Sequence, residues 1–209
     1  MRALHPQVPS GAGIVQYRID RGFARSIHAV QPRKALVLEL ATPEDYATEY
    51  RAVIRVGFNW NRFHKERWPI AAARVVDRQM LGNSILPWYL GRTGQEVVCD
   101  AADATPIRLA QIPVVLASLN EKRQAGIQEY VYQFRQQPSV KFSVPSYDLG
   151  NNRQLSLDGN HRLSALLLTD VPFTVTFWSV RGPMEADCLL DLIHWVSSAE
   201  PGAAADGGA

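Results

Sequence analysis

One short stretch constrains this chain more than any other, because it joins a strand pattern to a helix pattern through a single glycine. Residues 154–157 alternate like a strand, Asp158 and Gly159 follow, and residues 161–168 have the apolar spacing of a helix. Such a junction gathers the unpaired N–H groups of the first helical turn at one point. Those groups and the helix dipole favour anions, and glycine allows close backbone approach. The pattern predicts an anion site from Asp158 to Arg162.

The side chains of this turn suit phosphate. His161 and Arg162 add donors beside the exposed N–H groups, and an arginine can hold two phosphate oxygens at once. We therefore expect Gly159, Asn160, His161 and Arg162 to bind phosphate. Asp158 has two interpretations that the residues leave open: it caps the helix, or it binds a metal ion or a hydroxyl group.

The chain before residue 100 predicts helices and a hairpin. Thr42 and Pro43 are typical of a helix start, and that helix is expected to end near Val56. A second helix is expected after Pro69, with apolar positions that continue to Met80. Residues 88–90 and 96–99, separated by a glycine-containing turn, predict a β-hairpin.

The second half shows a cleaner pattern. Residues 107–115 are extended, and residues 118–121 have the spacing of a capping box, which predicts a helix with Ile127 and Phe134 on its apolar stripe. Residues 141–144 and 154–157 predict a hairpin, residues 173–180 a strand, and residues 184–195 a last helix. Residues 199–209 have too few bulky side chains to offset the entropy of being ordered.

These elements predict an α+β chain in three parts. Residues 1–105 form an arm and a mainly helical extension with a hairpin. Residues 106–198 form a unit in which a small mixed sheet is flanked by helices and followed by a C-terminal helix. Residues 199–209 form a disordered tail.

Composition limits the functional classes. The chain has 22 basic and 20 acidic residues, a balance that does not favour a dedicated nucleic-acid-binding domain. The basic residues between Arg51 and Arg78 form either a solvated helix face or a local basic patch. No apolar run approaches the roughly 20 residues of a membrane helix. The N-terminus lacks the pattern of a secretory signal, so a cytoplasmic location is expected.

Two further groups of residues carry weaker signals. Cys99 and Cys188 lie far apart and lack the spacing of a zinc or redox motif, so both are expected to be buried thiols. A polar cluster between residues 59 and 66 is either a substrate wall or a surface without function. His64 and Glu66 are two positions apart, which does not suit joint metal ligation. The cluster consists of Asn59, Asn61, Arg62, His64 and Glu66.

The segment from Leu157 to Leu166, LDGNHRLSAL, followed by Val171-Pro172 and the strand at 173–180, resembles the DGxHRxxAl signature of the ParB/sulfiredoxin-like superfamily. The likeness covers about 75 residues, 107–181. It implies a ParB/sulfiredoxin-like fold, a small mixed sheet flanked by helices that binds a nucleotide phosphate or another acidic group at this turn.

The branches of this superfamily differ in function. Sulfiredoxins resemble the motif but have a cysteine where this chain has Asn160, and chromosome-partitioning ParB proteins add a helix-turn-helix domain of which the remaining residues show no sign. The free-serine-kinase-like branch is closest in pattern, because it has an acidic residue at the start of the helix before the hairpin. Glu121 occupies that position. It is also what a capping box with Ser118 requires, so its role stays open.

The resemblance implies a nucleotide-dependent phosphotransferase or phosphohydrolase that acts on a small molecule with ATP, ADP or CTP and Mg²⁺. Glu121, Asp158 and His161 are the candidate catalytic residues, and Asp158 is also the candidate metal ligand. The alternative is a non-catalytic module that binds nucleotide or DNA. A third interpretation is a turn that binds a non-nucleotide acid. The residues select neither the nucleotide, the acceptor nor the oligomeric state.

Overall fold

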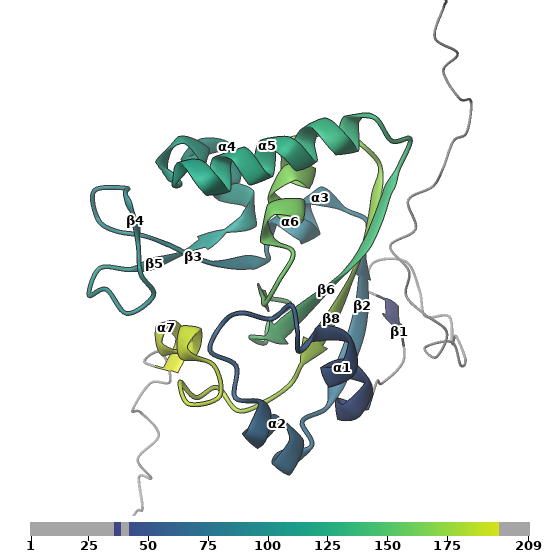
Figure 1. The fold of residues 1–209 in the computed structure, drawn as a ribbon, viewed down its shortest axis with the longest axis vertical. Coiled ribbons are helices and arrows are strands. Elements are labelled where there is room, and N and C mark those ends of the chain that lie inside the picture. The colour runs from purple at the N-terminus through teal and green to yellow at the C-terminus, as the bar shows by residue number, and fades with distance from the viewer. Residues whose placement is uncertain (1–35, 39–41, 197–209) are drawn as a thin grey trace, which may run out of the picture.

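Strands from both halves of the chain share one mixed sheet in the computed structural model, which describes residues 36–38 and 42–196. Within these residues the sheet has eight strands in the order β1-β2-β8-β6-β7-β3-β4, with β5 also paired to β3 (Figure 1). The strands are β1 (Leu36–Leu38), β2 (Ile70–Val75), β3 (Ile85–Leu90), β4 (Glu96–Val97), β5 (Thr105–Arg108), β6 (Val140–Asp148), β7 (Gln154–Ser156) and β8 (Phe173–Val180).

Helices flank this sheet, so the fold is α+β. In Figure 1, α4, α5 and α6 lie together at one end of the molecule, and α1, α2 and α7 lie at the other. The α-helices are α1 (Pro43–Tyr50), α2 (Trp60–Glu66), α3 (Arg78–Gly82), α4 (Ile112–Val115), α5 (Glu121–Arg135), α6 (Asn160–Leu167) and α7 (Ile193–Val196); the 3-10 helices are η1 (Leu109–Gln111), η2 (Leu116–Ser118) and η3 (Leu190–Leu192). None of the helices in the described residues is long and apolar enough to cross a membrane.

Both parallel and antiparallel pairs occur in the sheet. β6 and β8 are parallel over eight residue pairs, from Val140 opposite Phe173 to Tyr147 opposite Val180. β3 and β7 are also parallel, whereas β6 and β7 form the expected antiparallel hairpin. The β3–β4 hairpin and the strand at 173–180 are likewise confirmed.

The expected boundary near residue 105 falls at the first residue of β5. Strands on either side of it are hydrogen-bonded to each other, because β2 pairs with β8 and β3 pairs with β7. The expectation that the first part is mainly helical was wrong, since its described residues supply β1 to β4 as well as three short helices.

The helix expected after Pro69 was wrong in its first half, because Ile70–Val75 is strand β2. This strand lies between β1 and β8, and Ile70, Ala71, Ala72 and Val75 are buried. A strand covered on both faces shows a nearly continuous apolar run instead of alternation, and such a run also satisfies helical spacing. Only α3 is helical in this segment.

Three helix ends differ from the sequence prediction. The first helix, α1, ends at Tyr50 instead of near Val56, and turns then carry Ile54 and Phe58 into the core. The helix expected at 184–195 is wrong over its first part, because the backbone carbonyls of Asp187 and Cys188 accept hydrogen bonds from Asn59 instead of from helical N–H groups. Asn120, not Ser118, caps α5, so the expected capping box is wrong; Ser118 closes the preceding 3-10 helix. The tail at 199–209 lies outside the described residues.

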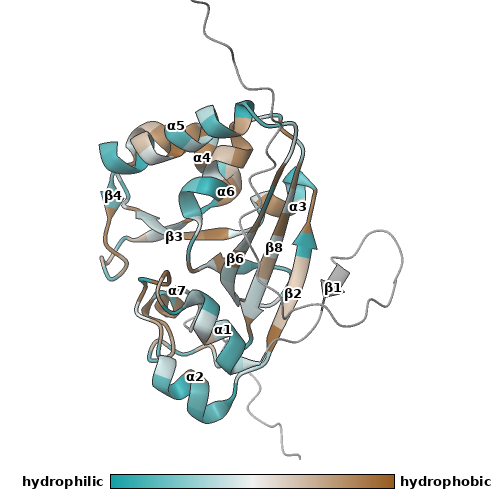
Figure 2. Ribbon diagram, turned by 45° about the vertical axis from the view of Figure 1, so that its right-hand side comes forward, coloured by the Kyte–Doolittle hydropathy of each residue, from teal (hydrophilic) through white to brown (hydrophobic). Residues whose placement is uncertain are grey.

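Two hydrophobic cores cover the two faces of the sheet. Along β8, Val175 and Phe177 belong to the core beneath α5 and α6, whereas Trp178 and Val180 belong to the core beneath α1 and α2. Figure 2 shows mostly hydrophobic residues along β8 and mostly hydrophilic residues on α2. Burial of each large apolar side chain contributes roughly 1.5–3 kcal/mol to the stability of the fold. The two cores therefore hold the junction between β7 and α6 from both faces of the sheet.

Candidate functional site

The predicted turn, Asp158 to Arg162, lines a pocket of about 670 Å³. The pocket lies between the start of α6, the start of α5, strand β3 and the turns that follow α1. Its lining residues are Ala52, Val53, Arg55, Val56, Pro87, Trp88, Asn120, Lys122, Arg123, Tyr130, Leu157, Asp158, Gly159, Asn160, His161 and Arg162. The five residues of the turn therefore meet residues from the first half of the chain.

The N-terminus of α6 has the geometry of an anion site. Gly159 is its N-cap with φ +78°, a left-handed conformation that glycine adopts without strain, and no side chain caps the helix. Within the described residues, the N–H groups of Asn160, His161 and Arg162 have no hydrogen-bond acceptor. Asp158 therefore does not cap α6, and the first-turn donors are left for a ligand.

Arg162 is held in the pocket wall. Its Nη2 lies 3.4 Å from Asp158 Oδ2, and its Cζ lies 5.0 Å from the centre of the Phe142 ring. A Cβ on Gly159 would lie 3.2 Å from the same Nη2, so the guanidinium folds closely over the turn. These contacts orient the guanidinium before any ligand arrives, which lowers the entropy cost of binding.

His161 lies between strand β3 and helix α5. Its ring is 5.2 Å from the Trp88 ring, and a Cβ on Gly126 would lie 2.9 Å from His161 Cδ2. Burial lowers the pKa of His161, the positive charges of Arg123 and Lys122 add to this effect, and Asp158 opposes it. The imidazole therefore favours its neutral form more strongly than a free histidine does.

The side chain of Asn160 is engaged within the fold. Ser156 Oγ donates a hydrogen bond to Asn160 Oδ1 and lies 3.2 Å from the carbonyl oxygen of Ile85. This link joins the start of α6 to β7 and β3. Because only the Oδ1 atom is engaged, Asn160 can still offer a ligand its backbone N–H and its Nδ2 group.

Positive charge dominates the pocket. Arg55, Lys122, Arg123 and Arg162 line it against the single carboxylate of Asp158. Arg123 Cζ lies 4.6 Å from the centre of the Trp88 ring, and its Nε lies 2.8 Å from Glu96. Sequence reasoning missed Arg123, Lys122 and Trp88. Lys122 and Arg123 could have been found from the cap of α5. If the cap had been assigned to Asn120, both residues would have been placed in the first turn of that helix.

Glu121 does not line this pocket. It is the first residue of α5 and is exposed, although Asn120 and Lys122 on either side of it do line the pocket. Of the six residues expected at the site, the five from Asp158 to Arg162 line the pocket and Glu121 does not.

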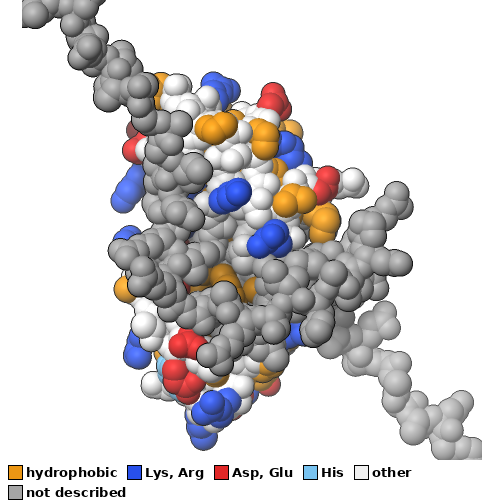
Figure 3. Space-filling model, turned by 90° about the vertical axis from the view of Figure 1, so that its right-hand side faces the viewer, with side chains coloured by type: hydrophobic (Ala, Val, Ile, Leu, Met, Phe, Trp, Pro, Cys, Tyr) orange, Lys and Arg blue, Asp and Glu red, His pale blue; other side chains and the backbone are white. Residues whose placement is uncertain are grey.

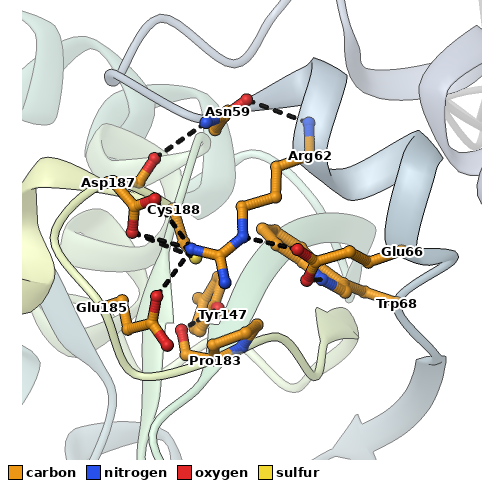
Figure 4. Close-up of polar contacts among 9 residues, drawn as sticks. All are labelled: Asn59, Arg62, Glu66, Trp68, Tyr147, Pro183, Glu185, Asp187 and Cys188. Carbon is orange, nitrogen blue, oxygen red and sulfur yellow. Dashed lines mark hydrogen bonds and ion pairs between the residues drawn. The ribbon is translucent and has the colours of Figure 1, made fainter.

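Asn59 and Arg62 of the polar cluster at residues 59–66 form a clamp between α2 and the segment 183–188, and none of the five cluster residues lines the pocket at Asp158. Figure 4 shows Arg62 at its centre. Its Nε lies 2.7 Å from Glu66, and its Nη1 lies 2.6 Å from Glu185 and 2.8 Å from Asp187. Glu185, Asp187 and Cys188 are the one group of three close metal-ligand atoms in residues 36–38 and 42–196, and Arg62 already supplies their positive charge.

The chain matches no family model, no curated protein and no solved structure in our comparisons. The likeness to ParB/sulfiredoxin-like proteins therefore rests on the motif at 157–166. The structure itself gives a mixed sheet flanked by helices and a basic pocket at the motif.

Proposed function

We propose that this chain is a nucleotide-dependent phosphotransferase or phosphohydrolase that acts on a small molecule and binds the nucleotide phosphates at the Asp158 to Arg162 turn. The supporting observation is that the uncapped start of α6 faces a pocket with four cationic side chains and one carboxylate. Free helical N–H groups, a guanidinium and further positive charges together suit a polyphosphate better than a single carboxylate group.

The size and the walls of the pocket support a nucleotide. Its volume of about 670 Å³ lies within the range of roughly 300–1,000 Å³ that is typical of small-molecule sites. Trp88 and Tyr130 add aromatic surface to the walls, and Pro87 and Val53 add apolar surface. The phosphates would lie at α6, and the base and sugar against these walls.

Phosphoryl transfer needs positioning and charge stabilisation more than covalent participation by the protein. A bond forms between the acceptor oxygen and the terminal phosphorus, the bond from that phosphorus to the bridging oxygen breaks, and the acceptor loses a proton. Asp158 lines the pocket and is better placed than Glu121 to receive this proton. One carboxylate does not serve well both as base and as metal ligand, so where Asp158 holds Mg²⁺ the neutral imidazole of His161, which has a free nitrogen, is the candidate base. Water as acceptor gives hydrolysis instead of transfer.

The donor set also fits Mg²⁺. This ion is commonly held by one or two carboxylates together with the substrate phosphates, and Asp158 supplies one carboxylate at the pocket. When bound, Mg²⁺ would neutralise part of the phosphate charge. The Asp158 carboxylate lies 3.4 Å from Arg162, so the two residues would hold metal and phosphate side by side.

Binding of ATP, ADP and CTP, with and without Mg²⁺, tests this proposal by isothermal titration and by the shift in melting temperature. Arg162→Ala should weaken nucleotide binding about tenfold or more, because hydrogen bonds to charged groups contribute roughly 1.5–3 kcal/mol. Arg67→Ala is the matched control, since Arg67 is exposed and makes one 3.5 Å ion pair with Glu44, away from the pocket. Equal affinity in wild type and Arg162→Ala would contradict the site, and absence of phosphate release or transfer would contradict the activity.

DNA binding by the basic stretch from Arg51 to Arg78 is less well supported. Arg62 is paired with carboxylates, Arg78 donates to the carbonyl oxygens of Leu166 and Val171, and Arg55 lines the pocket. The stretch is not one solvated helix face, because strand β2 lies within it. On the face shown in Figure 3, the visible Lys and Arg side chains stand in several separate places, with hydrophobic and acidic side chains among them. DNA affinity that falls steeply with salt, without nucleotide turnover, would favour this alternative.

A further inference from the structure

A second pocket of about 520 Å³ adjoins the phosphate pocket. The two pockets share Val56, Pro87, Trp88, Asn120 and Arg123 in their walls. The second pocket is completed by strands β3 and β4, by Cys99 and by Leu190 and Asp191 of η3. Leu190 and Asp191, which are near the C-terminal end of the described residues, thus lie beside the proposed nucleotide site.

The balance of charge is reversed in this second pocket. Its wall has two acidic side chains, Glu96 and Asp191, and one cationic side chain, Arg123. Glu96 is already satisfied, because it accepts hydrogen bonds from the N–H and Nδ2 of Asn120 and lies 2.8 Å from Arg123 Nε. None of these contacts involves Asp191, the second acidic side chain of the pocket wall.

Asp191 is buried with 5% of its surface exposed, and no lysine or arginine of the described residues forms an ion pair with its carboxylate. Tyr89 donates a hydrogen bond to Asp191 Oδ1, and the His194 ring stacks on Tyr89 at 4.7 Å. His194 Nε2 lies 2.9 Å from the carbonyl oxygen of Cys99, so its ring is engaged elsewhere. Burial raises the pKa of the Asp191 carboxyl, which the Tyr89 hydrogen bond and the charge of His194 oppose. A buried carboxyl group without a cation is costly unless something compensates it.

We propose that the second pocket binds the ammonium group of a small primary amine through the carboxylate of Asp191, directly beside the phosphate site. Tyr89 and the backbone N–H of Asp191 itself already donate to this carboxylate, and an ammonium ion would add the directly paired positive charge that these neutral donors do not supply. The assignment of this amine as the second substrate rests on the proposed function, whereas the binding itself does not.

Cys99 provides a reporter for occupancy of this pocket. Cys99 is partly exposed and lines the pocket, so the expectation of a buried thiol was wrong for this residue, whereas Cys188 is fully buried and lines neither pocket. A ligand at Asp191 should therefore slow the reaction of Cys99 with a small thiol reagent. Cys188 in the same molecule serves as the internal control.

The experiment measures the rate at which methyl methanethiosulfonate modifies Cys99 of the full chain, by peptide mass spectrometry, in the presence of ethanolamine. Ethylene glycol is the matched probe, because it replaces only the ammonium group by a hydroxyl group. We expect ethanolamine to give saturable protection and ethylene glycol to give none. Equal behaviour of the two probes would overturn the proposal.

Two variants place the effect at Asp191. Asp191→Asn retains the size and the oxygen that accepts from Tyr89 but removes the charge, and it should weaken ethanolamine protection about tenfold or more, as expected for a charged hydrogen bond. Val98→Lys adds a positive charge at an exposed position in the pocket wall and should weaken it without disturbing the core. Protection that is unchanged in both folded variants would also overturn the proposal.

Arg162→Ala separates this proposal from the proposed function. It should leave ethanolamine protection intact while it weakens nucleotide binding. If wild type binds no nucleotide but ethanolamine still protects Cys99, the proposed function fails and the amine site stands. If nucleotide binds and ethanolamine does not protect, the amine site fails alone.

Discussion

The ring of His161 lies so close to the backbone of Gly126 that a Cβ at that position would be 2.9 Å from His161 Cδ2. Gly126 is in the middle of α5, a position where glycine is less favourable than alanine by roughly 1 kcal/mol in isolated helices. Glycine at position 126 is therefore less favourable for the helix itself but leaves room for the imidazole of His161.

Gly126→Ala should displace His161 and weaken nucleotide binding while changing stability little, because better helix propensity offsets the close contact. Titration calorimetry and thermal unfolding check the two effects. Gln128→Ala, at an exposed position of the same helix, is the control and should change neither. Wild-type affinity in Gly126→Ala would show that the position of His161 is unimportant.

Gly159→Ala should reduce both stability and nucleotide affinity. Its φ of +78° costs an L-residue roughly 1–2 kcal/mol, and the added Cβ would lie 3.2 Å from Arg162 Nη2. Gly94→Ala is a close match in backbone, with φ +82° and no atom within 4 Å of the added Cβ. We expect the two variants to lose similar stability in chemical denaturation, and only Gly159→Ala to lose binding. If Gly159→Ala bound nucleotide as tightly as wild type does, Arg162 would not belong to the nucleotide site.

His161 should make stability depend on pH. Because its pKa is lowered in the folded chain, the unfolded chain binds this proton more tightly. The contribution to stability is present above pH 6.5, the ordinary value, and is lost as the pH falls through the lowered pKa. Melting temperatures of wild type should therefore decrease more on acidification than those of His161→Gln. If the melting temperatures of the two proteins decreased equally on acidification, the fold would not lower the pKa of His161.

Arg62→Met should lower the melting temperature more than Arg67→Met. Arg62 contacts Glu66, Glu185 and Asp187, and its removal leaves three carboxylates close together. Arg67 makes one exposed ion pair, a type that contributes little. High salt should narrow the difference between the variants, because it screens the remaining repulsion. A difference insensitive to salt would point to lost packing of the Arg62 side chain instead.

The local elements around the turn could be predicted from the sequence. The strand before Asp158 and the helix after Gly159 both follow from residue types within a few positions, whereas the left-handed conformation of Gly159 was found only in the structure. β2 was missed because Ile70-Ala-Ala-Ala-Arg-Val75 satisfies helical spacing, and only its place between β1 and β8 decides the matter. That place depends on residues about a hundred positions away.

The composition of the pocket could not be predicted for the same reason. Trp88 reaches the site because β3 lies parallel to β7, with Ile85 opposite Leu155. Arg55 reaches it because α1 stops at Tyr50 and the chain turns toward the sheet. Neither event has a local signal, so the sequence indicated an anion site but not the walls that surround it.

The place of β2 beside β8 also affects how the chain acquires its shape. During synthesis, Ile70–Val75 emerges long before Phe173–Val180, so a strand with buried alanines waits for its neighbour while about a hundred further residues are made. Contacts between residues so far apart in sequence slow folding, and they leave apolar surface and an unpaired strand edge exposed in the nascent polypeptide. Efficient production of this protein should therefore depend on temperature and on chaperones that shield that strand until translation has passed Val180.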